Sequence, residues 1–571
     1  MDEAREEARR VLEECCSQKI SLEDIKLSQV GDLTATVAFK LAKKLKKNPV
    51  EVAEEIAGKI RPCGLIAGVE AVNGYLNFSL DYGKFAKHVL SRIINDGDDY
   101  GKPLVSPEEK IVLEHTSVNP SGPIHVGRLR NTLIGDSIKR ILCFSGYDVE
   151  THYFVNDMGK QMATIALGFK ECIAPDAEVM ERYSRYRSKQ DFQVFFEYVA
   201  ANKLFESDHA FQERVQSTIR KAESGDPKAL DEITWVAEKC LEGQKRVFDF
   251  LDISFDVFDF ESKFIKNKAA FEVVSRLERG DCWKKTEIGS GLDLSAYGIE
   301  KGGGITVLKR LDGTSVYLAR DLAYHMEKRE CGDRLINVLG EDHKLQAAEL
   351  KTILEKFLGF GKTIDVVHYS FVSFEGSKLS TRKGEIASVD ELLDEAVEKA
   401  KIEVEKRGIA GEETALKIGV GSVKYHIIKT APSKPITFSW EEALSFEGES
   451  APYIQYVHAR SCRILEKGGT GAGDIDVEDV DLSLEDIEKQ LIKELSLFPG
   501  VVESAARELK PNLIANYVHS LASTYNKFYI QCPVLNAEKK VRERRLLMVY
   551  SAKQVIKTGL RLLGIEAPES M

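Results

Sequence analysis

The 571-residue sequence lacks any long uninterrupted apolar run, any Cys-x-x-Cys pair, and any internal repeat or low-complexity tract. A membrane-spanning helix needs about 20 consecutive apolar residues, so no transmembrane span is expected. The opening residues MDEAREEARR have neither the basic flank nor the apolar core of a signal peptide, and we expect a cytoplasmic protein. The ten cysteines, scattered from Cys15 to Cys532, indicate reduced structural thiols, because disulfide frameworks and zinc ribbons show regular cysteine spacing.

The sequence also lacks an excess of positive charge. Its formal net charge is −11, which argues against nonspecific coating of nucleic acid, since such binding depends on neutralising phosphates with Lys and Arg. Any contact with nucleic acid must therefore be local. Two basic stretches, each by itself typical of a solvated helix face, are Lys43, Lys44, Lys46 and Lys47, and then Lys539, Lys540, Arg542, Arg544 and Arg545.

What is present indicates a folded chain of several domains. Hydrophobic residues make up 43% and charged residues 30%, and the length exceeds the roughly 250–300 residues at which single cores stop growing. The apolar periodicity and the turn residues predict a small α+β domain over residues 1–105 and an α/β domain over 106–400, with a charged helical insertion at about 170–260. They further predict a connecting helical region over 401–450 and an all-α helical bundle over 451–571.

The central region has the pattern of a doubly wound sheet. Four short apolar segments, KIVLEH, DVETHYFV, RLINVL and IDVVHYSFV, alternate with helical segments. Strands separated by helices favour a parallel sheet. We therefore predict a Rossmann-like domain here.

Residues 111–147 contain the strongest single pattern. A strand is followed by NPSGP, which breaks regular structure, and then by a helix whose apolar positions recur until Gly146. His125 and Gly127 fall at the start of this helix, where free N–H groups and the helix dipole favour phosphate. A glycine lets a nucleotide lie close, and an imidazole there can donate to a phosphate oxygen whose charge grows during displacement.

The segment HVGR resembles the HIGH signature of class I aminoacyl-tRNA synthetases, with Arg128 in place of the second histidine. A second segment, FEGSKLSTRKGE, resembles the KMSKS loop of the same class. Lys378 and Ser380 match that motif, whereas Thr381 replaces its second lysine and leaves Arg382 or Lys383 as a possible substitute. The resemblance implies that these residues bind ATP and that His125, Gly127 and Lys378 take part in catalysis.

The resemblance becomes specific for arginyl-tRNA synthetases at EHTSVNPSGPIHVGRLRN, VLKRLDGTSVYLARDLAYHMEK, SFEGESAPYIQYVHAR and LLGIEAPESM. A guanidinium carries five donors in a fixed fork and stays charged, so its pocket needs a carboxylate. The family resemblance implies that Tyr317 and Asp321, one helical turn apart, bind the guanidinium. It further implies an arginine-binding role for Glu114, Ser117, Asn119 and His343.

The resemblance also implies contacts with tRNA at both ends of the chain. Reading unstacked bases requires aromatic faces and nearby cations. The family pattern gives the anticodon role to the helical bundle and a D-loop (tRNA elbow) role to the N-terminal domain. The implied contacts are Tyr75, Asn77, Tyr453, Tyr456, Arg460, Tyr525 and Met571.

The resemblance thus implies an arginine–tRNA ligase that uses ATP, with Mg²⁺ carried by the ATP phosphates, to activate arginine and esterify it to the terminal adenosine of tRNA-Arg. We expect a monomer with no membrane partner and no dedicated metal ligands. One alternative is a glutamyl, glutaminyl or cysteinyl synthetase, against which YLARD counts. The other is a binding protein that kept the fold but lost catalysis, against which His125, Gly127 and Lys378 count.

Overall fold

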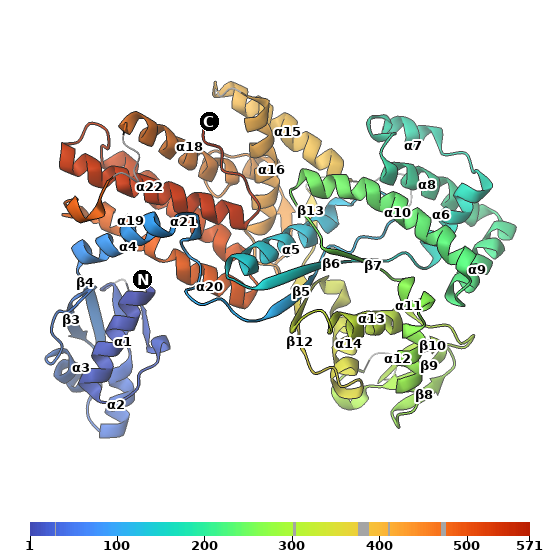
Figure 1. The fold of residues 1–571 in the computed structure, drawn as a ribbon, viewed down its shortest axis with the longest axis horizontal. Coiled ribbons are helices and arrows are strands. Elements are labelled where there is room, and N and C mark those ends of the chain that lie inside the picture. The colour runs from blue at the N-terminus through green and yellow to red at the C-terminus, as the bar shows by residue number, and fades with distance from the viewer. Residues whose placement is uncertain (29, 301–303, 375–386, 409–410, 470–474) are drawn as a thin grey trace.

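The computed structural model describes residues 1–571 except 29, 301–303, 375–386, 409–410 and 470–474. Figure 1 shows an N-terminal unit at one end, a parallel sheet near the centre, an insertion at the opposite end, and a helical bundle beside the N-terminal unit. The predicted fold class, an α/β domain with an N-terminal α+β domain and a C-terminal helical bundle, is confirmed. Within the described part of the chain, no helix is both long and apolar enough to cross a bilayer.

The N-terminal unit is a four-stranded antiparallel sheet with helices, in the strand order β1-β2-β4-β3. Alternating burial on β4 places Leu76, Phe78 and Leu80 in the core. The elements are α1 (Asp2–Cys16), β1 (Ile25–Leu27), β2 (Leu33–Ala35), α2 (Val37–Leu45), α3 (Pro49–Ala57), β3 (Ile66–Val72), β4 (Tyr75–Leu80) and α4 (Tyr82–Asp96).

The central sheet has five parallel strands in the order β12-β11-β5-β6-β7. All four predicted strand segments contribute to it, because apolar residues such as Ile111 and Ile336 are buried at its centre. Its elements are β5 (Lys110–Glu114), α5 (Val126–Phe144), β6 (Asp148–Val155), β7 (Val257–Phe260), α13 (Tyr317–Lys328), β11 (Arg334–Gly340), α14 (Lys344–Phe357) and β12 (Thr363–Tyr369).

Two units are inserted between β6 and β11. The first is helical, as the sequence predicted: α6 (Lys160–Glu171), α7 (Ala177–Arg182), α8 (Gln190–Ser207), α9 (His209–Glu223) and α10 (Pro227–Phe250). The second follows β7 and was not predicted: α11 (Lys263–Lys266), α12 (Ala269–Leu277) and a three-stranded antiparallel sheet of β8 (Trp283–Thr286), β9 (Gly289–Asp293) and β10 (Ile305–Arg310).

The remainder of the chain is mainly helical. Strand β14 (Ile436–Phe438) pairs in parallel with β13 (Val372–Phe374), so the chain returns to the α/β domain before the bundle begins. The helices are α15 (Val389–Lys406), α16 (Glu412–Ile428), α17 (Trp440–Ala443), α18 (Ala451–Gly468), α19 (Asp486–Ser496), α20 (Phe498–Glu508), α21 (Asn512–Gln531) and α22 (Lys539–Leu562).

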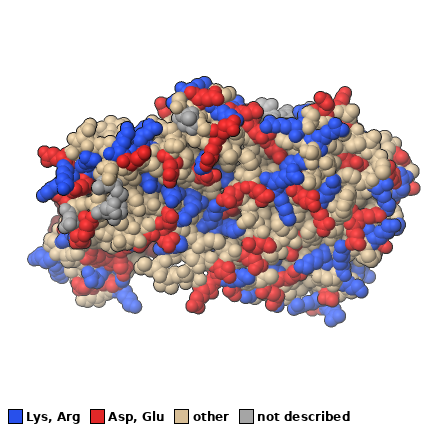
Figure 2. Space-filling model, turned by 45° about the horizontal axis from the view of Figure 1, so that its top comes forward, with Lys and Arg blue, Asp and Glu red and all other residues tan. Residues whose placement is uncertain are grey.

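The charged side chains are intermixed on the surface. Figure 2 shows Lys and Arg interspersed with Asp and Glu over the whole face in view, without one continuous basic surface. This distribution agrees with the net charge of −11. On this face, binding of a nucleic acid would therefore depend on local groups.

Candidate functional site

The candidate site lies where the strand order reverses. Strands β5 and β11 are hydrogen-bonded neighbours, but the next strand after β5, β6, lies on its other side and the strand after β11, β12, lies beyond β11. Chain segments leaving the carboxyl ends of such a pair diverge and open a crevice that binds ligands in doubly wound sheets. The segments after β5 and β11 carry half of the residues that the sequence predicted for ATP and arginine.

His125 is the N-cap residue of α5. Its Nδ1 accepts a hydrogen bond from the backbone N–H of Gly127 at 3.0 Å, so Nδ1 carries no proton. Burial, together with the nearby Arg128, lowers the pKa of His125 and keeps the ring neutral. In a neutral ring the proton then resides on Nε2, which makes His125 a donor at the start of the helix.

The loop of His125 pairs directly with residues that follow the KMSKS-like segment. His125 and Ser388 form an isolated antiparallel bridge, in which the Val126 N–H donates to Ala387 O at 2.9 Å and the Val389 N–H donates to Ile124 O at 2.8 Å. Arg128 is exposed, and its Nη1 lies 3.4 Å from the hydroxyl of Tyr369 at the end of β12. Lys378, Ser380 and Thr381 lie outside the described residues.

Arg130, which sequence reasoning missed, is a fully buried cation on α5. Its Nη1 donates to the backbone oxygens of Ser370 and Lys434, both at 2.7 Å, and its Nη2 donates to Ala431 O at 3.0 Å. Burial lowers its pKa to about 10. Arg130 thereby holds α5 against the segments that lead into β13 and β14.

The backbone after β5 has an unusual conformation. Thr116 and Ser117 have φ angles of 76° and 38°, a region that non-glycine residues occupy only at a cost in free energy. The Thr116 N–H donates to the side chain of Asn131 at 3.0 Å, and Asn131 donates to Val338 O at 3.0 Å, which holds the segment between α5 and β11. Asn119 is exposed beside this segment.

Within this segment, the hydroxyl of Ser117 is buried and has no hydrogen-bond partner among the described residues. A free buried hydroxyl beside a strained turn is a typical ligand contact. The structure thus places the predicted Ser117 and Asn119 together after β5.

Tyr317 and Asp321 lie on the first turn of α13 and face the same side. Tyr317 is half-buried, and its ring lies edge-on to that of Phe154 at the end of β6, with 6.2 Å between centroids. Burial and the carboxylate of Asp321 raise the pKa of the Tyr317 hydroxyl, so it stays protonated. Asp321 is half-buried, and its Oδ1 lies 3.0 Å from Nδ1 of His325. The predicted guanidinium pair is therefore assembled on one helix.

Two further predicted arginine-site residues lie at the ends of the neighbouring strands. Glu114 ends β5, is almost fully buried, and accepts a 2.5 Å hydrogen bond from Lys328 Nζ. His343 follows β11 and is half-buried, with Nε2 3.7 Å from Asp342 Oδ2. Glu114 thus already has a cationic partner within the chain, whereas His343 has only a distant one among the described residues.

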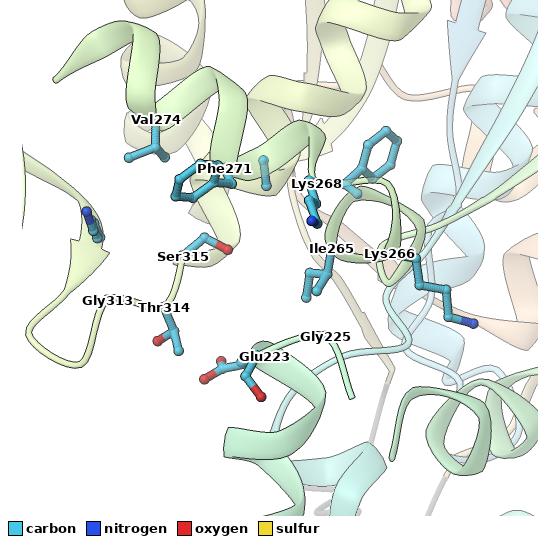
Figure 3. A pocket seen from close by; sticks show the side chains of 14 residues that line it. Glu223, Gly225, Ile265, Lys266, Lys268, Phe271, Val274, Gly313, Thr314 and Ser315 are labelled. Atoms are coloured by element: carbon cyan, nitrogen blue, oxygen red, sulfur yellow. The ribbon is translucent and has the colours of Figure 1, made fainter. Parts of the chain in front are cut away.

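A separate hollow of about 400 Å³ lies beside this region, between the turn that joins α9 to α10, helices α11 and α12, and the loop before α13 (Figure 3). None of the predicted site residues lines it, although Ser315 on its wall is close in sequence to Tyr317. Two of its cations, Lys266 and Lys309, are paired with Asp231 and Glu278, and Lys268 is a third cation on its wall. Because it shares no residue with the predicted site, this pocket is distinct from the crevice.

One group of potential metal ligands lies beneath the crevice. Glu150, His152 and Cys331 could offer three ligand atoms within 4.8 Å of one another. Both nitrogens of His152 are already bound, at 2.9 Å to Glu150 and at 2.8 Å to Asp259, and Glu150 also accepts from Lys110 at 2.7 Å. These internal partners account for the group without a metal.

The two predicted tRNA contacts of the N-terminal unit differ in accessibility. Tyr75 is 43% exposed at the start of β4, and its ring contacts that of Phe39 edge-on at 4.9 Å. Asn77, on the same strand, is only 8% exposed and pairs with Thr34 across the sheet. Tyr75 can therefore meet a base from outside, while Asn77 supports the strand.

In the bundle, one cluster joins α18 to α21. The Asn526 amide donates to the Tyr453 hydroxyl at 2.8 Å, and its oxygen accepts from Arg460 Nη1 at 3.0 Å. The guanidinium of Arg460 lies 4.5 Å from the ring centre of Tyr456 and 4.8 Å from that of Tyr529. Tyr529, which sequence reasoning missed, is partly exposed. The rings of Tyr456 and Tyr529 and the guanidinium of Arg460 thus lie together in one cluster.

Tyr525 and Met571 have different surroundings. Tyr525 is fully buried on α21, so its ring is not open to a base, and we leave it out of the proposed tRNA surface. Met571 packs, as Trp440 and Phe446 do, against a small apolar cluster formed by Ala400, Val404, Ala415, Ile418 and Leu444. The chain end is held against α18, where Gln455 donates to Glu566 O at 2.8 Å and His458 Nδ1 lies 2.9 Å from Pro568 O.

Comparison with known families first defines the class. The catalytic domain family "tRNA synthetases class I (R), catalytic domain" matches residues 89–440, which include the sheet, the crevice and both insertions. Together with the parallel sheet and a histidine at the start of α5, this match defines a class I aminoacyl-tRNA synthetase. The flanking regions match the "Arginyl tRNA synthetase N terminal domain" over residues 2–80 and the "DALR anticodon binding domain" over 454–571.

The chain belongs to the arginyl-tRNA synthetase family. It is 41% identical to the arginine–tRNA ligase of Methanocaldococcus jannaschii, with 98% of each chain covered. It is 39% identical to the enzyme of that name from Archaeoglobus fulgidus, covering 95% of this chain and 96% of the relative. The arginyl-tRNA synthetase structure from Thermus thermophilus superposes with a TM-score of 0.81 at 27% identity, covering 99% of this chain and all of that one.

Proposed function

We propose that this chain activates arginine with ATP in the crevice between β5 and β11, and then transfers it to the terminal adenosine of tRNA-Arg. The observation that carries this proposal is the joint placement of a neutral donor, His125, at the start of α5 and of a carboxylate, Asp321, on α13. One end of the crevice fits a triphosphate and the other a guanidinium.

The chemistry requires no covalent intermediate on the protein. An oxygen of the arginine carboxylate bonds to the α-phosphorus of ATP, and the bond from that phosphorus to the pyrophosphate oxygen breaks. Nε2–H of His125 and the N–H groups at the start of α5 stabilise the charge that grows on the phosphate oxygens. A ribose hydroxyl of the terminal adenosine then attacks the arginyl carbonyl, and AMP leaves.

Positioning contributes the rest of the rate. We propose that Ser117 and Asn119 hold the amino and carboxylate groups of arginine, with His343 assisting from the β11 side, and that Tyr317 and Asp321 hold the guanidinium. Fixing both ends of the substrate converts a bimolecular encounter into an oriented one. Glu114 acts in this proposal through Lys328, since its carboxylate is already paired.

ATP and Mg²⁺ enter this proposal together. His125 and Arg128, at the start of α5, are a neutral and a cationic group and suit phosphate oxygens better than a metal cation. We therefore assign Mg²⁺ to the triphosphate, whose charge it would partly neutralise. Lys378, Ser380 and Thr381 remain ATP contacts by resemblance alone.

The same proposal gives the tRNA two surfaces. Tyr453, Tyr456 and Arg460 on α18 form the proposed anticodon surface, because stacked bases need aromatic faces beside a cation. Met571 is assigned to the same anticodon-binding domain by resemblance alone. Tyr75 forms a proposed contact at the tRNA elbow.

Charging assays test this proposal directly. Total tRNA should be charged in an ATP-dependent manner with labelled arginine and with no other amino acid. Asp321→Asn should raise the KM for arginine by about 100-fold or more, since breaking a buried charge pair costs several kcal/mol. Its KM for ATP should stay within twofold.

A matched control is Asp312→Asn, because Asp312 lies on an exposed turn five residues before Tyr317 and bonds only Thr314 among the described residues. This variant should behave like the unmodified enzyme. A folded Asp321→Asn enzyme with an unchanged arginine KM would remove Asp321 from the pocket.

A further inference from the structure

A row of buried polar side chains runs from the catalytic sheet to Asp321. Lys328 Nζ donates to Glu114 Oε2 at 2.5 Å and to Asn337 Oδ1 at 3.0 Å. The amide nitrogen of Asn337 lies 2.8 Å from His325 Nε2. His325 Nδ1 in turn lies 3.0 Å from Asp321 Oδ1 and 2.9 Å from the Asp321 backbone oxygen. All but Asp321 are at most 8% exposed.

The chemistry of this row fixes the direction of each hydrogen bond. A lysine ammonium can only donate, so the Asn337 atom that faces Lys328 must be the oxygen. The Asn337 NH₂ group therefore points at His325 and donates to Nε2. An Nε2 that accepts carries no proton, so the imidazole proton of His325 is on Nδ1. From there it donates to the Asp321 backbone oxygen at 2.9 Å and also faces Oδ1 of the Asp321 carboxylate at 3.0 Å.

We infer that Asn337 and His325 are positioning residues that select one tautomer and thereby orient the Asp321 carboxylate for a planar guanidinium. This inference rests on the proposed function of Asp321 as the guanidinium partner. A guanidinium binds a carboxylate best through two parallel hydrogen bonds, which demand one carboxylate orientation. A substrate with a lysine or a neutral side chain cannot form these two parallel bonds and gains nothing from the fixed carboxylate. The fixed orientation therefore raises the affinity for arginine relative to other amino acids.

The row links amino acid recognition to the two strands that flank the crevice. Glu114 ends β5 and Asn337 lies within β11, whereas His325 and Asp321 lie one turn apart on α13. The ammonium of Lys328 also sits over the ring of Tyr324, 4.4 Å from its centre, which restricts the lysine further. Lys328, Asn337 and His325 are thus each held by at least two contacts, as a positioning group must be.

Asn337→Asp is the first test, because aspartate has nearly the same shape and keeps an oxygen toward Lys328 but cannot donate to His325. The ring must then carry a proton on Nε2. A neutral ring in that state turns a lone pair toward Asp321, and a doubly protonated ring places a positive charge against the carboxylate that should receive the substrate. In both cases we expect the KM for arginine to rise at least tenfold and the KM for ATP to stay within twofold.

The matched control for this variant is Asn267→Asp. Asn267 is exposed and accepts a hydrogen bond from the Ala269 N–H at 3.0 Å, a role that aspartate retains. It should leave both KM values unchanged. An Asn337→Asp enzyme that unfolds at the normal temperature yet shows an unchanged arginine KM would overturn the inference.

Two substitutions of His325 distinguish the role of its Nδ1 from that of its Nε2. The terminal nitrogen of asparagine is as far from Cβ as Nδ1, so His325→Asn can still donate to Asp321. The terminal nitrogen of glutamine is nearer the place of Nε2, so His325→Gln loses that donor. We expect His325→Asn to keep an arginine KM several-fold below that of His325→Gln, and equal values or the reverse order would overturn the inference.

A double-mutant cycle distinguishes this inference from the proposed function. If Asn337 acts through Asp321, then Asn337→Asp should change the arginine KM less than twofold in an Asp321→Asn background. Additive effects would assign Asn337 a separate structural role and overturn the inference while leaving Asp321 in place. An Asp321→Asn enzyme with a normal arginine KM would instead refute the proposed function.

The tautomer itself can be measured without substrate. In enzyme labelled with ¹⁵N-histidine, the His325 resonances, assigned by their loss in His325→Asn, should show a protonated Nδ1 and an unprotonated Nε2. Asn337→Asp should reverse that pattern or protonate both nitrogens. A protonated Nε2 in the unmodified enzyme would overturn the inference whatever the role of Asp321.

Discussion

Glu197 offers a test of how burial controls the stability of the insertion. It lies on α8, is 5% exposed, and its Oε1 is buried without a hydrogen-bond partner among the described residues. Burial alone raises the pKa of this carboxyl from 4.5 to about 7. The group also lies against Gly168 of α6, where a Cβ atom would come within 2.5 Å of Oε1. We predict that Glu197→Gln stabilises the protein at neutral and alkaline pH.

The expected magnitude follows from the raised pKa. The folded state holds the proton of Glu197 more tightly than the unfolded state does. The free energy of unfolding is therefore highest below pH 4.5, where both states are protonated, and it falls as the pH rises from 4.5 through about 7. The ionised form costs about 3 kcal/mol once the pH is well above 7. Glutamine has nearly the same shape and no charge, so the substitution removes this cost.

The assay is thermal unfolding of the two proteins from pH 5 to pH 8.5, compared at each pH. The difference in Tm should be small at pH 5, should grow between pH 5 and pH 7, and should level off at several degrees above pH 7, since about 1 kcal/mol shifts Tm by roughly 2–4 °C in a unit of 150–250 residues. Glu206→Gln on the same helix is the control, because Glu206 is exposed. A difference that does not depend on pH, or a less stable variant at pH 8.5, would refute the reasoning.

Three further predictions concern the tRNA surface and the assembly of the site. Tyr456→Ala should raise the KM for tRNA by about 5- to 150-fold, since each lost base stack is worth about 1–3 kcal/mol, and a folded variant that charges tRNA normally would show that this tyrosine is only a packing residue. Arg130→Met should lower kcat in charging assays more than it raises the arginine KM, because it frees three backbone oxygens that hold α5 to the segments before β13 and β14; an unchanged kcat would refute that role. Pyrophosphate exchange with arginine should be near background until tRNA-Arg is added, because Thr381 replaces a lysine of the KMSKS pattern, and strong exchange without tRNA would mean that Arg382 or Lys383 supplies the charge.

The strands of the catalytic sheet could be predicted because their burial depends on local sequence. The segment DVETHYFV matches β6 (Asp148–Val155) residue for residue, and its apolar end is buried between two other strands. The small sheet of β8, β9 and β10 was missed. Its strands are short and partly exposed, and β9 contains Gly289 and Gly291, whose lack of a side chain lets β10 approach closely.

The site could be predicted only where a motif is local. His125 and Gly127 are two residues apart and define their own geometry, since one bonds the other. Arg130 instead depends on partners about 240 and 300 residues away, and no local pattern separates it from an exposed arginine on the same helix. Tyr453 and Tyr525 look alike in sequence, but only packing of α18 against α21 decides that the second is fully buried.

Strands β5 and β11 support both ends of the proposed crevice. Asn131 of α5 bonds the backbone after β5 and a carbonyl of β11, so the phosphate end is tied to both strands. Glu114 and Asn337 on those strands hold Lys328, so the guanidinium end is tied to them as well. A change in the spacing of β5 and β11 must therefore move the donor His125 and the acceptor Asp321 together. The helical insertion is tied to the phosphate end as well, because Gln244 of α10 donates to Gly122 O at 2.8 Å, three residues before His125, and Asn119 donates to Gln161 of α6 at 3.3 Å. Glu197 takes part in neither bond, so we expect a change there to alter stability without disturbing the alignment on which the chemistry depends.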